Sequence, residues 1–125
     1  MAITQAVCTS FKQELLVEGH NFTNGQDTFK IALYTSSASL DASTTAFTTS
    51  NEVSDSGSYS SGGGSLTSVT PTTSGTTAIC DFADISFTSA TITARGAMIY
   101  NSSNSNKAVC ILDFGGDKTS TSGTF

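Results

Sequence analysis

The stretch Thr91–Phe114, TITARGAMIYNSSNSNKAVCILDF, decides the fold that the sequence predicts. Its first part, Thr91–Tyr100, alternates in a way that is typical of a β-strand. The residues expected on one face of this strand are Ile92, Ala94, Met98 and Tyr100. The polar run Asn101–Asn106 then predicts a hairpin loop, and Lys107–Phe114 predicts a second strand. Because this second strand carries apolar residues on both faces, we expect it to be central in a sheet.

Working outward, further strands are predicted on both sides of this hairpin. Asp27–Ser36, DTFKIALYTS, alternates Phe29, Ile31 and Leu33 with other residues. Short connections predict that Thr76–Thr88, with Ala78, Cys80 and Phe82 on one face, continues into Thr91–Phe114 as one antiparallel meander. Leu66–Pro71 is predicted to form an edge strand that ends at Pro71. The sequence GGDKTSTSG, residues 115–123, predicts a turn before a further strand that starts at Thr124 and Phe125.

A long loop is predicted between these groups of strands, over Ser36–Ser65. The segment consists mostly of Ser, Thr, Asn and Gly, and we expect it to project from one side of the domain. Leu40, Phe47, Val53 and Tyr59 are the apolar residues that interrupt it. Loops of this length are uncommon in small domains unless they bind something. A binding loop and a plain surface loop both fit the sequence.

The N-terminal segment predicts the one α-helix, over about residues 4–18. Val7, Phe11 and Leu15 recur every four positions and are expected to be buried. Thr4 is the expected N-cap, and Gly19 the expected left-handed residue that ends the helix.

Composition agrees with a small, mainly β-domain. The chain has 125 residues and 12.8 kDa, with 21 Ser and 21 Thr, and charged residues make up only 12%. This size suits a single domain over 1–125, with a β-domain over about 27–125 after the helix. The predicted fold is an antiparallel β-sandwich or flattened barrel with one N-terminal α-helix.

Several function classes are disfavoured by the residues. The basic residues are few and scattered and the net charge is −5, which disfavours nucleic acid as a partner. No apolar run is long enough to span a membrane, and the N-terminus lacks the features of a secretion signal. His20, the only histidine, is expected to satisfy helix-terminal carbonyl groups. We therefore predict no catalytic residues, no metal and no cofactor.

The cysteines and the acidic pairs are interpreted as structural. In the expected meander Cys80 and Cys110 lie two strands apart, beyond the disulfide reach of about 7 Å. We expect all three cysteines, including Cys8, to be free and buried in a reducing compartment. The pairs Asp81/Asp84 and Asp113/Asp117 lack the spacing of a calcium loop and are expected to be solvated strand ends.

Three blocks of the sequence resemble a family of small structural proteins of tailed bacteriophages. They are DTFKIALYTSSASL (27–40), NEVSDSGSYSSGGGSL (51–66) and DFADISFTSATITARGAMIYNSSNSNKAVCILDFGGDKTSTSGTF (81–125). The resemblance covers nearly everything after about Gly19. Members continue past the closing SGTF into one more strand, so the resemblance implies an incomplete C-terminal strand in this chain.

The resemblance implies a non-enzymatic virion component that is made in the host cytoplasm. Our first hypothesis is a capsid decoration (cement) protein on the outside of the head, with the major capsid protein as its partner. Open sheet edges would also allow self-association. The alternatives are a tail, neck or baseplate protein, and a carbohydrate- or receptor-binding module of a fibre that uses Tyr59 and Phe47. The residues expected at the interface are Asn51, Glu52, Tyr59, Gly62, Gly63 and Gly64.

Overall fold

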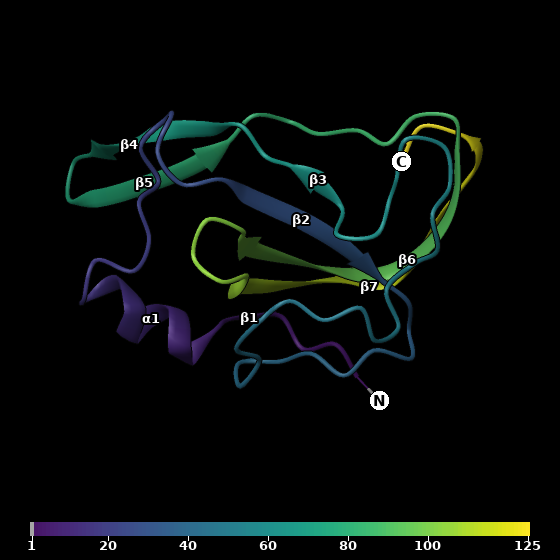
Figure 1. Ribbon diagram of the computed structural model, residues 1–125, viewed down its shortest axis with the longest axis horizontal. Helices are drawn as coiled ribbons and strands as arrows, with labels where there is room; N and C mark the ends of the chain where they lie inside the picture. The colour runs from purple at the N-terminus through teal and green to yellow at the C-terminus, as the bar shows by residue number, and fades with distance from the viewer. Residues whose placement is uncertain (1) are drawn as a thin grey trace.

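Two antiparallel sheets and one short helix make up the computed structural model of the chain, which describes residues 2–125 (Figure 1). The large sheet has the strand order β1 (Ala6–Val7), β7 (Lys107–Gly123), β6 (Ala90–Asn101), β2 (Phe29–Tyr34) and β3 (Gly64–Ser65). The second sheet is the hairpin of β4 (Ser68–Ser74) and β5 (Thr77–Phe82), and helix α1 spans Thr9–Leu15. The mainly β, antiparallel fold class with one N-terminal helix is confirmed, and the sheets do not close into a barrel.

The β6–β7 hairpin is the centre of the fold, as the sequence predicts. The two strands pair from Ala90↔Gly123 to Asn101↔Lys107, and the loop between them is the expected polar run. β7 lies between β1 and β6, and its residues Ala108, Val109 and Ile111 are buried. The expected central position of this strand is therefore confirmed.

The turn predicted at residues 115–123 is wrong, because these residues belong to β7. Gly96 of β6 pairs with Asp113 of β7, and Ala94 of β6 pairs with Lys118 of β7. Between these two pairs β7 advances by five residues, whereas β6 advances by two. The three extra residues form a bulge in which Gly115 has a φ of 78°. The chain ends beside Phe87, whose backbone N–H and C=O both bond to Phe125 (2.9 and 2.8 Å). Thr124 and Phe125 follow β7 and belong to no strand among the described residues.

The predicted meander from residue 76 is also wrong. Both edges of β6 are occupied, one by β7 and the other by β2, which pairs with β6 from Phe29↔Asn101 to Tyr34↔Gly96. β5 has no edge of β6 to join, so it ends at Phe82 and pairs only with β4. Pro71 lies inside β4 instead of ending it. It falls at a register shift between Val69 and Thr72, and a proline is tolerated at such an irregularity.

The helix is shorter than predicted, because the residues before it join the large sheet. Ala6 and Val7 form β1 and pair with Ile111 and Cys110, so the N-cap is Cys8 and not Thr4. A helix starting near residue 4 would leave this edge of β7 unpaired. Phe11 is buried as expected, whereas Val7 and Leu15 are 48% and 45% exposed.

The end of the helix also differs in detail from the prediction. Glu18, and not Gly19, takes the left-handed conformation, with a φ of 60°. Gly19 donates its N–H to the Glu14 carbonyl at 2.7 Å. A Cβ at Gly19 would lie 2.9 Å from the Cβ of Glu14, so the glycine is required by close packing.

The segment 36–65 does not project from the domain but packs along it. Leu40, Val53 and Tyr59 are buried, and isolated bridges join the segment to neighbouring parts of the chain. Leu40 belongs to a core cluster with Phe11, Phe29, Met98 and Tyr100. Val53 and Tyr59 belong to a second cluster with Leu33, Phe87 and Ile92. Three of the four apolar residues that interrupt this segment in the sequence are thus core residues.

Candidate binding surface

Three of the predicted contact residues, Glu52, Tyr59 and Gly62, form a cluster around the carboxylate of Glu52. One carboxylate oxygen, Oε2, accepts hydrogen bonds from the Tyr59 hydroxyl and the Gly62 N–H, both at 2.7 Å. The other oxygen, Oε1, accepts one from the Ser61 hydroxyl at 2.9 Å. Because three donors converge on it, the carboxylate is largely satisfied within the loop itself.

Tyr59 is an internal residue of this cluster. Its side chain is fully buried, and its ring packs edge-on against Phe87 with centroids 4.9 Å apart. Its hydroxyl also accepts a hydrogen bond from the Leu33 N–H at 2.9 Å, on the side of β2 next to the two-residue strand β3. Burial raises the pKa of Tyr59 above its ordinary value. The ring is therefore not exposed for binding a sugar or a protein.

The three glycines pack closely against β2 and Tyr100. Gly62 accepts a hydrogen bond from the Tyr100 hydroxyl at 2.6 Å. Gly63 has a φ of 79°, and a Cβ there would lie 1.7 Å from the Ile31 carbonyl oxygen. Gly64 belongs to β3 and pairs with Ile31. Glycine is needed here for close backbone approach and not for flexibility.

Two further residues considered for binding, Asn51 and Phe47, lie outside this cluster. Asn51 is exposed, has a φ of 61° and accepts the Thr35 N–H through its carbonyl. Phe47, the other aromatic residue considered for sugar binding, is half-buried and stacks on Tyr100. The structure thus brings Glu52, Tyr59 and Gly62 together as an internal clamp of the loop.

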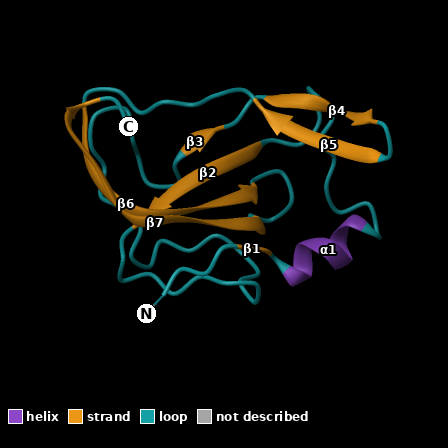
Figure 2. Ribbon diagram, turned by 180° about the vertical axis from the view of Figure 1, so that it is seen from behind, coloured by secondary structure: helices purple, strands orange, loops and turns teal. Residues whose placement is uncertain are grey.

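An apolar groove of about 770 Å³ lies beside β5, and the sequence did not predict it. α1 and the β4–β5 hairpin extend beyond the same end of the large sheet (Figures 1 and 2), and residues of all three line the groove. The lining residues are Val7, Phe11, Leu15, Phe22, Leu66, Pro71, residues 78–85, Ile99, Val109 and Cys110. The signal in the sequence is the apolar run Ala78–Cys80: the sequence predicts Ala78 and Cys80 on one face of a strand with Cys80 buried, and the structure leaves all three residues exposed.

The groove contains two of the three thiols. The cysteines are free, as expected, but Cys80 is exposed, so the expectation that all three are buried is wrong. Desolvation raises the pKa of Cys80, and it raises the pKa of the half-buried Cys110 to about 11. These thiols are therefore protonated near neutral pH, which is unfavourable for a nucleophile.

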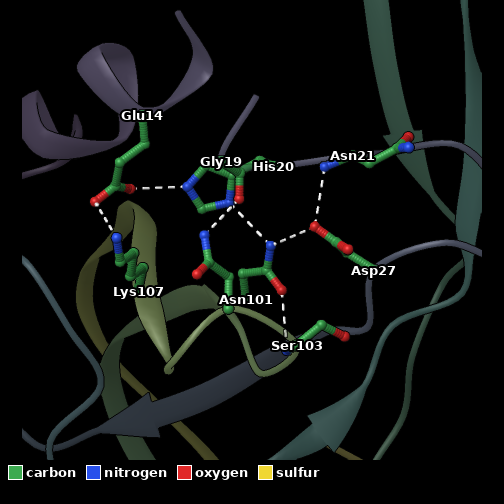
Figure 3. A network of polar contacts seen from close by, with 9 residues as sticks. Glu14, Gly19, His20, Asn21, Asp27, Asn101, Ser103 and Lys107 are labelled. Atoms are coloured by element: carbon green, nitrogen blue, oxygen red, sulfur yellow. Dashed lines mark hydrogen bonds and ion pairs between the residues drawn. The ribbon is translucent and has the colours of Figure 1, made fainter. Parts of the chain in front are cut away.

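A buried polar network anchors the end of α1 to the β6–β7 turn (Figure 3). The Nε2 of His20 lies 2.8 Å from the Oε1 of Glu14, and its Nδ1 lies 3.0 Å from the Nδ2 of Asn101. Lys107 lies 3.8 Å from the other oxygen of Glu14. His20 therefore contacts side chains, and the expectation that it satisfies helix-terminal carbonyls is wrong. The Gly19 carbonyl is satisfied instead by Asn104, at 2.6 Å.

The hydrogen bonds define the tautomer of His20. Asn101 accepts the Ser103 N–H through Oδ1 at 3.0 Å and donates through Nδ2 to Asp27 at 2.8 Å. This orientation directs a second N–H of Asn101 at Nδ1 of His20, which must accept it. The proton of the neutral ring is then on Nε2 and is donated to Glu14. With both nitrogens bonded and no exposed side-chain surface, His20 is a structural residue.

Within residues 2–125, no three His, Cys, Asp or Glu side chains are grouped so that they could hold a metal ion. No helix among these residues is long and apolar enough to cross a membrane. No protein-family model, curated protein or solved structure matches the chain.

Proposed function

We propose that this protein is a non-enzymatic structural protein of a tailed-phage virion, which binds the outside of the head as a decoration protein. The observation that carries the proposal is the order of the three sequence blocks that resemble phage structural proteins, 27–40, 51–66 and 81–125. The expected partner is the major capsid protein, and the protein would be made in the host cytoplasm before it joins the particle.

The character of the surface supports a role in contact rather than in chemistry. Charged residues are few, and Ser and Thr make up about a third of the chain, so contacts through this surface would depend little on salt. The groove beside β5 supplies an apolar area for a protein partner, and its thiols are protonated near neutral pH. Many copies on a symmetric lattice would convert weak single contacts into strong retention.

A particle-stability experiment tests this proposal. A ligand that binds only the assembled shell stabilises it by mass action. Particles that lack the protein should therefore release their DNA at a lower temperature and under milder osmotic shock than complete particles, and adding the purified protein back should restore their stability to that of complete particles. Equal stability of the two preparations would contradict a decoration role. Location of the protein in a single ring at the tail would favour the tail, neck or baseplate alternative.

A further inference from the structure

We propose that the groove beside β5 binds an extended polypeptide segment of another protein, which adds to the free edge of β5 as a third strand. The segment carries apolar side chains together with a Lys or an Arg. This inference goes beyond the proposed function, since it concerns the isolated protein and holds whether or not the partner is a virion protein.

The first argument is the unpaired edge of β5. The hairpin has only two strands, and β5 pairs with β4 alone. Ser74 and Thr77 flank a two-residue turn in which Gly75 has a φ of 60°, so they form a hydrogen-bonded pair. In an antiparallel pair of strands, the residue that follows a hydrogen-bonded pair directs its backbone N–H and C=O away from the partner strand. By this alternation, Ala78 and Cys80 present their backbone groups at the free edge.

The second argument is that the hairpin is incomplete as a sheet. Every residue from Val69 to Asp81 is exposed, and a two-stranded hairpin is only marginally stable by itself in water. Addition of a third strand through main-chain hydrogen bonds is a common mode of peptide recognition. Such a strand would complete the small sheet and cover its apolar residues.

The third argument is the shape and chemistry of the groove. Five consecutive residues of β5, Ala78–Phe82, line it, so it follows the length of the strand. Ile99, Val109 and Cys110 of the large sheet and Phe11 of α1 also line it. A strand laid along β5 would therefore place its side chains against apolar residues of the large sheet and of α1.

Charge identifies the kind of partner. The charged residues that line the groove are Asp81 and Asp84, and both are acidic. A second copy of this chain would bring the same two carboxylates and a net charge of −5 to the contact, which is unfavourable. A segment with a Lys or an Arg beside its apolar residues matches both the apolar lining of the groove and its negative charge.

The test uses synthetic peptides of about eight residues, which span the six residues of β5 at about 3.3 Å per residue. One peptide alternates Val with Lys, a second replaces each Lys with Glu, and a third carries a central Pro that prevents strand pairing. Alkylation of Cys80 by iodoacetamide reports occupancy, because Cys80 is exposed and lines the groove, while the fully buried Cys8 is an internal reference. Amide hydrogen exchange of Thr77–Phe82 is measured in parallel.

We expect the Val/Lys peptide to slow both Cys80 alkylation and exchange in β5, and the Glu and Pro peptides to have much weaker effects. Asp81→Asn and Asp84→Asn should each weaken binding of the Val/Lys peptide about two- to fivefold. Asp113→Asn is the matched control, since Asp113 is exposed, lies outside the groove and should leave binding unchanged.

Three results would overturn the inference. The first is no protection of Cys80 or of β5 by the Val/Lys peptide. The second is equal protection by the Lys and Glu peptides. The third is a concentration-dependent dimer, seen by sedimentation, that protects Cys80 without any peptide, which would identify a second copy as the occupant.

Discussion

Replacement of Tyr59 by phenylalanine tests whether segment 51–64 is an internal clamp. The substitution keeps the ring and its contact with Phe87 but removes the oxygen that bonds Leu33 and Glu52. The Leu33 N–H is left without this acceptor in a buried site, which costs about 1–3 kcal/mol. Glu52 loses one of its donors but keeps Ser61 and Gly62. We therefore expect Tyr59→Phe to lower the free energy of unfolding by about 2–4 kcal/mol.

Urea unfolding followed by circular dichroism measures this change, with an unchanged m-value as evidence that both proteins unfold in the same way. The melting temperature should fall by about 6–16 °C for a chain of this size. Tyr34→Phe is the matched control, because it removes a single hydrogen bond, to the Thr48 carbonyl, and should cost only about 1 kcal/mol. A decrease in the free energy of unfolding below about 0.5 kcal/mol for Tyr59→Phe would refute the internal role of this cluster. A larger decrease for Tyr34→Phe than for Tyr59→Phe would also refute it.

Other substitutions and conditions test the remaining features of the fold. Phe11→Ala should cost about 3–5 kcal/mol because Phe11 is buried, whereas Leu15→Ala should cost under about 1 kcal/mol, and equal losses in denaturant unfolding would contradict this assignment of the helix face. Gly63→Ala should cost at least about 3 kcal/mol because its Cβ would collide with a carbonyl of β2, while Gly25→Ala, with a φ of 86° and open space around it, should cost about 1 kcal/mol. Burial raises the pKa of all three tyrosines, so their contribution to stability is complete below about pH 10 and is lost as the pH rises further. Tyrosinate absorbance should therefore appear together with alkaline unfolding, and a tyrosine that ionises near pH 10 in the folded protein would contradict its burial.

The sequence predicted the central hairpin well because local signals and tertiary pairing agree there. The alternation in β6 and the polar loop after Asn101 predict that β6 pairs with β7, and the same alternating pattern predicts β2. In contrast, the spacing of Val7, Phe11 and Leu15 fits one face of a helix, but the free edge of β7 takes Val7 into the sheet. No local pattern reports an unoccupied strand edge elsewhere in the chain.

The candidate site was harder to predict, because polar groups in a loop serve equally well inside a fold and at its surface. The sequence predicts Glu52 and Tyr59 at an interface, and the structure shows that they bond to each other. The groove arises because β5 cannot join β6, and that depends on the pairing of β2 far away in the sequence. The apolar run Ala78–Cys80 gave no sign by itself that it would stay exposed.

The copy number of this chain in purified phage particles, measured against the major capsid protein by quantitative mass spectrometry, tests the proposed decoration role most directly. A decoration protein occupies equivalent sites over the whole shell, so we expect a fixed ratio close to that of the capsid subunits or of their symmetric clusters. Absence from the particles, or a ratio that corresponds to a single ring, would contradict the decoration role.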